Sequence, residues 1–292
     1  MSWSIVADSS CNLRSLADTS EDVTYSTVPM IIHVGDSDYV DDASLDVHEL
    51  NRAVAEEATA SSSSCPSAGV WAEEFRKADN IIAIAISINL SGSYEVANVA
   101  RNIVLDEYAR EHDGVVAGKN IYVLNSRAAG GKLEVIVKLL YRYLTNNNPT
   151  FEEAVAYVEN IEEHSQVLYS LSSYENLMKN GRMPRIAGMI ASKLNIRVLG
   201  TASPEGTIKI VGPARGEKKM AKKIVGVMEA DGYSGGMVYI DHVENEPAAK
   251  QLEESIRERW PEADVSILPC GALCSYYAEQ NGLIIGYTWA QI

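Results

Sequence analysis

The sequence lacks the features that mark several classes of protein. Its longest apolar run, Ile81–Ile86, has the length of a strand and is far below the ~18 residues that cross a bilayer. Only 4 cysteines occur in 292 residues, too few for a disulfide framework, so we expect reduced thiols. The chain begins without the basic region or cleavage-site pattern of a signal peptide. These features predict a cytoplasmic protein with no stable membrane insertion.

Positive charge is also scarce. There are 25 Lys and Arg residues against 40 Asp and Glu residues, and the formal net charge of −15 disfavours nucleic acid and anionic membranes as partners. One exception is a basic run whose spacing puts its charges on one helical face. It consists of Arg215, Lys218, Lys219, Lys222 and Lys223. A solvated helix face explains this run better than a docking patch, but both interpretations stay open.

The chain is longer than the ~250 residues at which single hydrophobic cores stop growing, which favours two domains. Its first half alternates β-branched runs with amphipathic stretches, which predicts a parallel, doubly wound α/β sheet. The expected strands are Ile5–Ala7, Val28–Val34, Ile81–Ile86 and Ile121–Leu124. The expected helices are Asp46–Ala58, Trp71–Lys77, Tyr94–Tyr108, Gly131–Tyr143 and Phe151–Glu162.

The second half includes pairs of extended runs joined by short turns, which favours a mixed α/β sheet. Its expected strands are Val167–Leu171, Ile196–Leu199, Ile208–Val211, Met237–Asp241, Val265–Leu268 and Leu283–Tyr287. The turn Ser203–Gly206 separates two of them. The change of pattern near Glu162–Ser165 predicts an N-terminal domain over 1–164 and a C-terminal domain over 165–292. No Gly/Ser-rich linker separates them, so we expect the domains to pack together.

Standard catalytic motifs are missing. Neither phosphate-binding glycine pattern occurs, and His48 begins a zincin-like motif in which Arg52 stands where the second ligand is required. Cys270 and Cys274 have no suitable metal-ligating partners and are better explained as buried small apolar residues. His242 is interpreted as a structural residue that ends a strand. The sequence therefore indicates no catalytic residue, metal or cofactor.

Two hydroxyl-rich segments each precede a predicted helix. One is Ser61–Ser67, and the other is Ile86–Ser93, which follows a buried strand. Helix N-termini offer free backbone N–H groups that suit a carboxylate or phosphate, and serine hydroxyls add neutral donors. Helix capping explains any single serine here. It explains less well why two segments carry clusters, because ligands of parallel sheets bind beyond the carboxyl ends of the strands. We therefore predict an anion site formed by both loops.

Eight short motifs lie along nearly the whole chain. The first is Asp8–Leu13. The others, in order, are Val28–Ile32 with Tyr39–Asp42, Ser63–Ser67, Leu90–Tyr94, Leu124–Arg127, Leu177–Met183, Ile196–Leu199 and Ile240–His242. In this order they resemble motifs of the DegV family of bacterial fatty-acid-binding proteins, which opens with Asp-Ser-Thr-x-Asp-Leu. Each motif is weak alone, but eight motifs in the family's order are hard to explain by chance.

The resemblance implies a two-domain binding protein that holds a long-chain fatty acid in a tunnel between its domains. It implies that the hydroxyls of Ser63 and Ser91 bind the carboxylate, with Gly92 and Ser93 at the start of the next helix. Arg182 either lies near the head group or faces a partner, unless it is an ordinary surface arginine. Members of the FakB type present the acyl chain to an ATP-dependent kinase subunit, which forms an acyl phosphate for phospholipid synthesis. The resemblance thus implies a binding protein and not the catalyst.

The chain departs from the family's pattern at three places, one of which is Ser63, where serine replaces a threonine and keeps the hydroxyl. Asn89 replaces a glycine of Ser-Gly-Leu-Ser-Gly-Thr, although asparagine tolerates the left-handed conformation. The family's His-Thr-Gly-Pro-Gly segment is replaced by Leu273–Tyr277, so a histidine is lost and two tyrosines are expected to reshape the tunnel mouth. Apolar residues for a tunnel wall are available, although core packing explains each of them better. They are Ile31, Ile82, Ile84, Met183, Ile186, Met189 and Ile190.

Two other functions stay open at this point. One is an acyl or phosphoryl transferase that uses Ser91 as its nucleophile, although the sequence around Ser91 lacks the glycines of a nucleophile elbow. The other is a module that binds a different small anion, such as a phosphate ester. A bound fatty acid recovered from the purified protein distinguishes fatty-acid binding from both alternatives.

Overall fold

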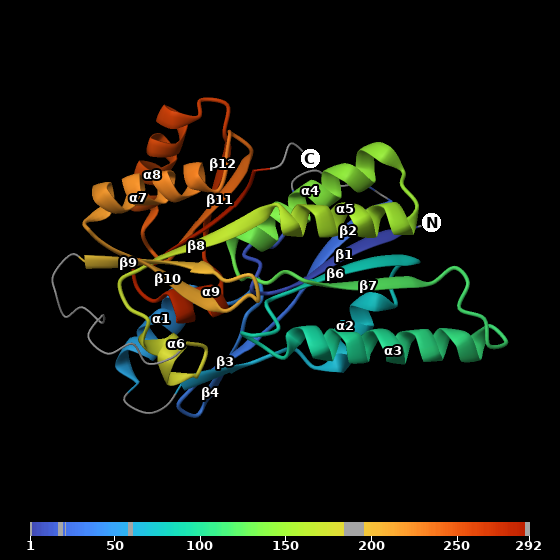
Figure 1. Cartoon of the computed structure of the whole chain (residues 1–292). Coiled ribbons are helices and arrows are strands. Elements are labelled where there is room, and N and C mark those ends of the chain that lie inside the picture. The colour runs from blue at the N-terminus through green and yellow to red at the C-terminus, as the bar shows by residue number, and fades with distance from the viewer. Residues whose placement is uncertain (1, 17–19, 21, 58–60, 184–195, 290–292) are drawn as a thin grey trace.

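The computed structural model describes residues 2–16, 20, 22–57, 61–183 and 196–289. It contains one parallel sheet, one mixed sheet and a small antiparallel sheet. Figure 1 shows the parallel sheet, formed by the N-terminal half, beside the mixed sheet of the C-terminal half, with helices on both. The predicted α/β class with two domains is confirmed. Within the described ranges, no helix is both long and apolar enough to cross a membrane.

The parallel sheet has the strand order β2-β1-β6-β7. Its strands are β1 (Trp3–Asp8), β2 (Val23–Val28), β6 (Asn80–Ala85) and β7 (Asn120–Asn125). Side chains alternate between its faces: Val6 packs toward α2 (Ala68–Phe75) and α3 (Ser93–Glu111), whereas Ile5 packs toward α4 (Gly131–Asn147) and α5 (Phe151–Glu163). Because helices cover both faces, β1 and β6 are buried along their whole length.

The mixed sheet has the order β10-β9-β8-β13-β11-β12, in which only β11 and β12 pair in parallel. Its strands are β8 (Ser165–Leu171), β9 (Ile196–Ala202), β10 (Ile208–Arg215), β11 (Met237–His242), β12 (Asp264–Pro269) and β13 (Leu283–Thr288). Helices α7 (Glu217–Ala230) and α8 (Glu246–Arg259) cover one face. Helix α4 lies against the other face, where a Cβ on Gly131 would meet the Gly286 backbone N at 2.3 Å. Only glycines permit this approach.

The small sheet has the order β4-β3-β5 and belongs to the N-terminal half of the chain. Its strands are β3 (Ile31–Val34), β4 (Ser37–Val40) and β5 (Ser61–Ser64). It packs with α1 (Val47–Glu56) and α9 (Ala272–Ala278), and Met30, Ile32, Leu273 and Tyr276 share one apolar cluster. The short helix α6 (Glu175–Lys179) also contacts α9. Helix α9, from the C-terminal half, therefore packs against the small sheet of the N-terminal half.

Three predicted elements differ from the structure. The strand expected over Val28–Val34 is two strands, because the chain leaves the parallel sheet at Pro29 and the Met30 N–H donates to the Ser9 Oγ at 2.9 Å. The segment expected to be a loop at Ser61–Ser64 is β5, which pairs with β3. Arg215 ends β10 and so does not lie on the helix that carries the other basic residues.

The division into domains follows the strands. All strands before His164 belong to the parallel and small sheets, and all strands after it belong to the mixed sheet. We propose 1–164 and 165–292 as the two domains on this basis. Helix α4 contacts strands of both large sheets, so the domains share an extensive interface.

Candidate ligand-binding site

A largely apolar cavity lies between the two domains; its empty space, open solvent included, is about 580 Å³. The N-terminal half contributes Met30, Ser63, Ile86, Leu90, Ser91 and Ala129. The C-terminal half contributes Tyr169, Leu171, Leu177, Arg182, Ile208, Leu273, Cys274, Tyr277, Ala278 and Ile284. Its lining is typical of small-molecule sites, which are apolar with a few polar groups.

Polar groups from four segments gather at one part of this wall. The Ser63 Oγ lies 2.8 Å from the Tyr277 Oη, and the Arg182 guanidinium lies 5.7 Å from the centroid of the Tyr277 ring. The Arg182 Nε donates to the Leu90 carbonyl at 3.3 Å, one residue before Ser91. Among the described residues, no carboxylate forms an ion pair with Arg182. The cluster therefore offers two serine hydroxyls, a phenol and a cation to a ligand.

Local structure explains the positions of the two serines. Ser63 is placed by the pairing of β5 with β3, in which it lies opposite Ile32. Ser91 lies in the loop between β6 and α3, where its N–H donates to the Ser87 carbonyl at 3.1 Å. Its Oγ accepts the Ser93 N–H at 3.3 Å, and its own proton stays available for another acceptor. Helix α3 begins at Ser93, so its partial positive charge lies beside Ser91.

Gly92 and Ser93 have supporting positions. Gly92 is the N-cap of α3, and neither residue belongs to the described wall of the cavity. Ser93 is fully buried, and its hydroxyl donates to the Asp8 Oδ2 at 2.7 Å. The same oxygen accepts the Ile86 N–H at 2.8 Å, and burial raises the pKa of Asp8. Ser93 thus stabilises the loop through its hydrogen bond to Asp8 and does not line the cavity.

The residues expected to form a tunnel wall are mostly elsewhere. Ile82 and Ile84 are fully buried in the core beneath α4, and Met183 belongs to the same core. Ile31 is not part of the described wall either, and Ile186, Met189 and Ile190 lie outside the described residues. The wall uses other aliphatic side chains, such as those of Ile86, Ile208 and Ile284. Sequence alone gave no signal for this choice, because it depends on how the two domains meet.

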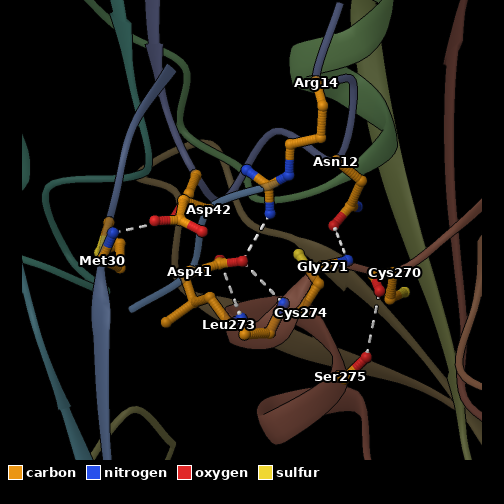
Figure 2. A network of polar contacts seen from close by, with 12 residues as sticks. Asn12, Arg14, Met30, Asp41, Asp42, Cys270, Gly271, Leu273, Cys274 and Ser275 are labelled. Carbon is orange, nitrogen blue, oxygen red and sulfur yellow. Dashed lines mark hydrogen bonds and ion pairs between the residues drawn. The ribbon is translucent and has the colours of Figure 1, made fainter. Parts of the chain in front are cut away.

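Side chains of the N-terminal domain hold the start of α9, as Figure 2 shows. The buried Asp41 carboxylate accepts the N–H groups of Ala272 and Leu273 at 2.8 and 3.0 Å. It also pairs with the Arg14 guanidinium at 2.6 Å, and the Asn12 Oδ1 accepts the Gly271 N–H at 2.8 Å. These contacts fix the helix that carries Cys274, Tyr277 and Ala278 on the cavity wall.

Two buried carboxyl groups bond Asn12, the residue that accepts the Gly271 N–H. Glu134 on α4 accepts the Asn12 N–H, and Asp241 on β11 accepts the Asn12 Nδ2 at 2.9 Å. The Glu134 Oε2 and the Asp241 Oδ1 have no hydrogen-bond partner in the part of the chain that is described. Burial raises the pKa of Glu134 to about 7 and the pKa of Asp241 well above its usual range. At least one of these groups therefore keeps its proton near neutral pH.

The structure also bears on the remaining chemical residues. All four cysteines are free, and Cys270 and Cys274 are buried, as predicted. His242 ends β11, also as predicted, and burial lowers its pKa. The described ranges contain no group of three or more His, Cys, Asp or Glu residues that would hold a metal ion.

No imidazole activates Ser91 among the hydrogen bonds of the described residues. A Ser–His–Asp chain of contacts occurs instead on the small sheet, where the His33 ring bonds Ser64 at 3.0 Å and Asp38 at 2.6 Å. Ser64 follows Ser63 on β5, so its side chain points to the opposite face of the small sheet. This chain of contacts is therefore directed away from the cavity.

Comparison with known proteins places these features in a family. The family described as "Uncharacterised protein, DegV family" matches residues 2–288. A DegV domain-containing protein of Streptococcus pneumoniae strain R6 is 38% identical over 287 residues, which cover 98% of this chain and 99% of that protein. A DegV domain-containing protein of Streptococcus pyogenes serotype M3 is 35% identical over the same length.

Solved structures similar to this chain contain fatty acids. The Streptococcus pneumoniae fatty acid kinase (Fak) B3 protein loaded with linoleic acid has a TM-score of 0.93 and 37% identity, covering 99% of this chain and 100% of that one. A DegV family protein from Eubacterium eligens loaded with heptadecanoic acid has a TM-score of 0.90 and 30% identity, with the same coverage. A Ruminococcus gnavus relative refined with vaccenic acid has a TM-score of 0.86 and 28% identity, covering 98% and 100%. By sequence over its whole length, this chain belongs to the DegV family.

Proposed function

We propose that the protein binds a long-chain fatty acid in the cavity between its domains. The observation that carries this proposal is the composition of the wall, which is mostly aliphatic and aromatic and includes the polar side chains of Ser63, Ser91, Arg182 and Tyr277. An acyl chain matches the apolar part, and a carboxylate matches the polar part. The fatty acids in the similar solved structures support the same ligand class.

The hydrocarbon tail supplies most of the affinity in this proposal. Burying an acyl chain of about 14–18 carbons at roughly 0.8 kcal/mol per methylene contributes on the order of 11–14 kcal/mol, against association costs of ~4–15 kcal/mol. A hydrogen bond to the charged head group adds roughly 1.5–3 kcal/mol. The polar cluster therefore orients the carboxylate and offsets its desolvation.

Ser63, Ser91 and Arg182 are the proposed carboxylate ligands. If Tyr277 donates its phenol proton to the Ser63 oxygen, the Ser63 proton is free to bind the ligand. Arg182 contributes positive charge, since its guanidinium contacts only backbone carbonyls and the Tyr277 ring among the described residues. Gly92 and Ser93 act through the backbone by placing the N-terminus of α3 near Ser91.

We further propose that the chain presents its fatty acid to an ATP-dependent fatty acid kinase subunit in the cytoplasm and is not itself the catalyst. In that reaction a carboxylate oxygen of the fatty acid attacks the γ-phosphorus of ATP, which gives an acyl phosphate and ADP. The similarity to the fatty acid kinase (Fak) B3 protein supports this role. A hydroxyl-bound carboxylate fits it, because hydroxyls hold the group without reacting with it.

The binding proposal is tested by denaturing extraction of the purified protein with mass spectrometry, followed by titration of the delipidated protein with stearate. We expect recovered fatty acid and a loss of affinity of about ten- to 150-fold in Ser63→Ala and in Ser91→Ala, the effect of one hydrogen bond to a charged group. Ser64→Ala is the matched control, because this serine points away from the cavity. Recovery of a polar phosphate ester instead of a fatty acid, or a covalent acyl adduct on Ser91, contradicts the proposal.

The presentation role has a separate test on α7, where Lys218 and Lys222 line an open groove with residues of α8. Charge reversal in Lys218→Glu with Lys219→Glu is expected to lower acyl-phosphate formation by a fatty acid kinase subunit, while stearate affinity stays unchanged. Unchanged acyl-phosphate formation removes this face as the docking site. No acyl phosphate from the unmodified protein contradicts the presentation role itself.

A further inference from the structure

One polar atom of the cavity wall is not explained by carboxylate binding. Tyr169 on β8 is only 6% exposed and lines the cavity, yet its hydroxyl has no hydrogen-bond partner in the described part of the chain. Other buried tyrosines differ: the Tyr174 hydroxyl contacts the Val198 carbonyl at 3.3 Å, and the Tyr276 hydroxyl lies 2.7 Å from the Ser61 Oγ. A phenylalanine would serve packing at the Tyr169 position without an unpaired polar atom.

Within the described ranges, the Tyr169 hydroxyl lacks an acceptor for its proton. Burial raises the pKa of Tyr169, so the phenol keeps its proton and is a donor. The backbone N–H of Ala129 lies near the Tyr169 oxygen and partly offsets the rise in its pKa. This N–H is a donor, so it cannot accept the phenol proton. The neighbouring Cys274 thiol is directed elsewhere, since it contacts the Ser10 carbonyl at 3.3 Å. The O–H of Tyr169 thus has no acceptor among the described residues, although Tyr169 lines an apolar cavity.

Two elements, β8 and α9, separate Tyr169 along the cavity wall from the polar cluster of Ser63, Arg182 and Tyr277. On β8, Tyr169 and Leu171 share the face that lines the cavity, and the chain runs from Leu171 through α6 to Arg182. On α9, Cys274 precedes Tyr277 by about one helical turn, and it is Cys274 that lies near Tyr169. A ligand anchored by its carboxylate at Ser63 and Arg182 therefore brings a carbon of its chain, and not its head group, to the Tyr169 hydroxyl.

We infer that Tyr169 selects fatty acids that carry a hydrogen-bond acceptor part-way along the chain. An oxygen substituent, hydroxy or oxo, is the full form of this acceptor, and the π-electrons of a cis double bond are a weaker form. The reason is that an unsubstituted chain leaves the phenol unpaired in a dry cavity, whereas an acceptor at that depth satisfies it. This inference rests on the proposed function and adds the chemistry of the chain to it.

The test measures the affinity of the delipidated protein for stearate, oleate and a set of mid-chain hydroxystearates. We expect the best-placed hydroxystearate to bind about tenfold more tightly than stearate, with oleate between them. In Tyr169→Phe this preference is lost, while stearate binds at least as tightly as before, which also shows that the variant is folded. Tyr174→Phe is the matched control, because this buried tyrosine does not line the cavity, and it is expected to keep the preference.

The outcomes separate this inference from the proposed function. If stearate binds tightly but no hydroxystearate is preferred, or if Tyr169→Phe keeps the preference, the inference is wrong and the proposed function stands. An ordered water that satisfies the phenol gives this same result. If neither stearate nor any other fatty acid binds, the proposed function fails and the inference fails with it.

Discussion

Two adjacent tyrosines of α9 contact the serine-rich strand β5 in different surroundings. The Tyr276 hydroxyl lies 2.7 Å from the Ser61 Oγ and also accepts the Asn180 Nδ2 at 2.9 Å, away from the cavity. The Tyr277 hydroxyl bonds Ser63 on the cavity wall, and its ring lies beneath the Arg182 guanidinium. The pair thus offers an internal comparison between a structural phenol and one at the proposed carboxylate site.

Tyr277→Phe is expected to weaken stearate binding about three- to tenfold, the effect of about one neutral hydrogen bond. The ring that Arg182 contacts is retained, so the loss reports on the phenol and its bond to Ser63. Tyr276→Phe is the control and is expected to leave affinity unchanged. Affinities are measured by titration of both delipidated variants. Equal affinities of Tyr277→Phe and the unmodified protein would exclude Tyr277 from the carboxylate site.

Hydroxyl-rich segments and the family resemblance predict Ser63 and Ser91 as carboxylate ligands, but they do not predict the contacts of these serines. Both serines line the cavity. The contact between Ser63 and Tyr277 joins residues 214 positions apart, so no local pattern encodes it. Tyr169 carries no signal either, because it lies in an ordinary apolar strand, and only the cavity makes its hydroxyl unusual.

The start of α9 is held by contacts from the other domain. The helix has seven residues, too few to be stable alone, and its N-cap residue, Gly271, has no side chain that could cap it. Asp41 supplies the cap from the N-terminal domain, and its carboxylate is almost fully buried beside Arg14. Since α9 carries Cys274 and Tyr277, this cap links the domain interface to the shape of the cavity.

Asp41→Asn is expected to lower the free energy of unfolding by about 2–4 kcal/mol, because it removes the negative charge from a buried ion pair and from the helix N-terminus. Stearate affinity is expected to fall as well, since the wall that α9 forms is loosened. Urea unfolding and stearate titration measure both effects. Asp42→Asn is the control: Asp42 is exposed and its carboxylate accepts only from Ser44 among the described residues. If Asp42→Asn destabilises the protein equally, the cap has no special role.

Strand β5 shows why some elements are hidden in the sequence. Four consecutive serines have no apolar alternation, and serine is not a strand-forming residue, so a loop was the natural prediction. The strand exists because β3 offers it a partner, with Ile31 opposite Ser64 and Val34 opposite Ser61. By contrast, β1 and β6 were predicted at their cores, because buried parallel strands are recognisable as continuous apolar runs.

In the whole molecule, the alternation of strands and helices was sufficient to predict two α/β domains, but not the way they meet. Their contact is formed by α4, which packs on β1 and β2 of one sheet and on β8, β11 and β13 of the other. Its first turns are almost completely buried, including Lys132 and Glu134. Because lysine and glutamate are seldom fully buried, these residue types do not indicate a helix enclosed between two sheets.

This enclosed position makes the stability of the molecule sensitive to pH. The pKa of Glu134 is about 7 in the folded protein, against an ordinary value of 4.5, because burial disfavours the carboxylate. Between pH 4.5 and 7 the unfolded chain loses this proton while the folded chain keeps it, so the free energy of unfolding falls as the pH rises. The raised pKa of Asp241 acts in the same direction. The contribution is fully present below the lower pKa and is lost above the higher one.

Glu134→Gln is expected to flatten this dependence, because the amide keeps an acceptor for the Asn12 N–H and does not titrate. The variant is expected to gain on the order of 2 kcal/mol of stability relative to the unmodified protein between pH 5 and pH 8, as the unmodified protein loses it. Urea unfolding at a series of pH values measures the difference. Glu111→Gln, at the exposed end of α3, is the control and is expected to follow the unmodified protein. A parallel pH profile for Glu134→Gln would mean that Glu134 is already ionised in the folded state, and that the junction of the two domains holds a charge there instead of a proton.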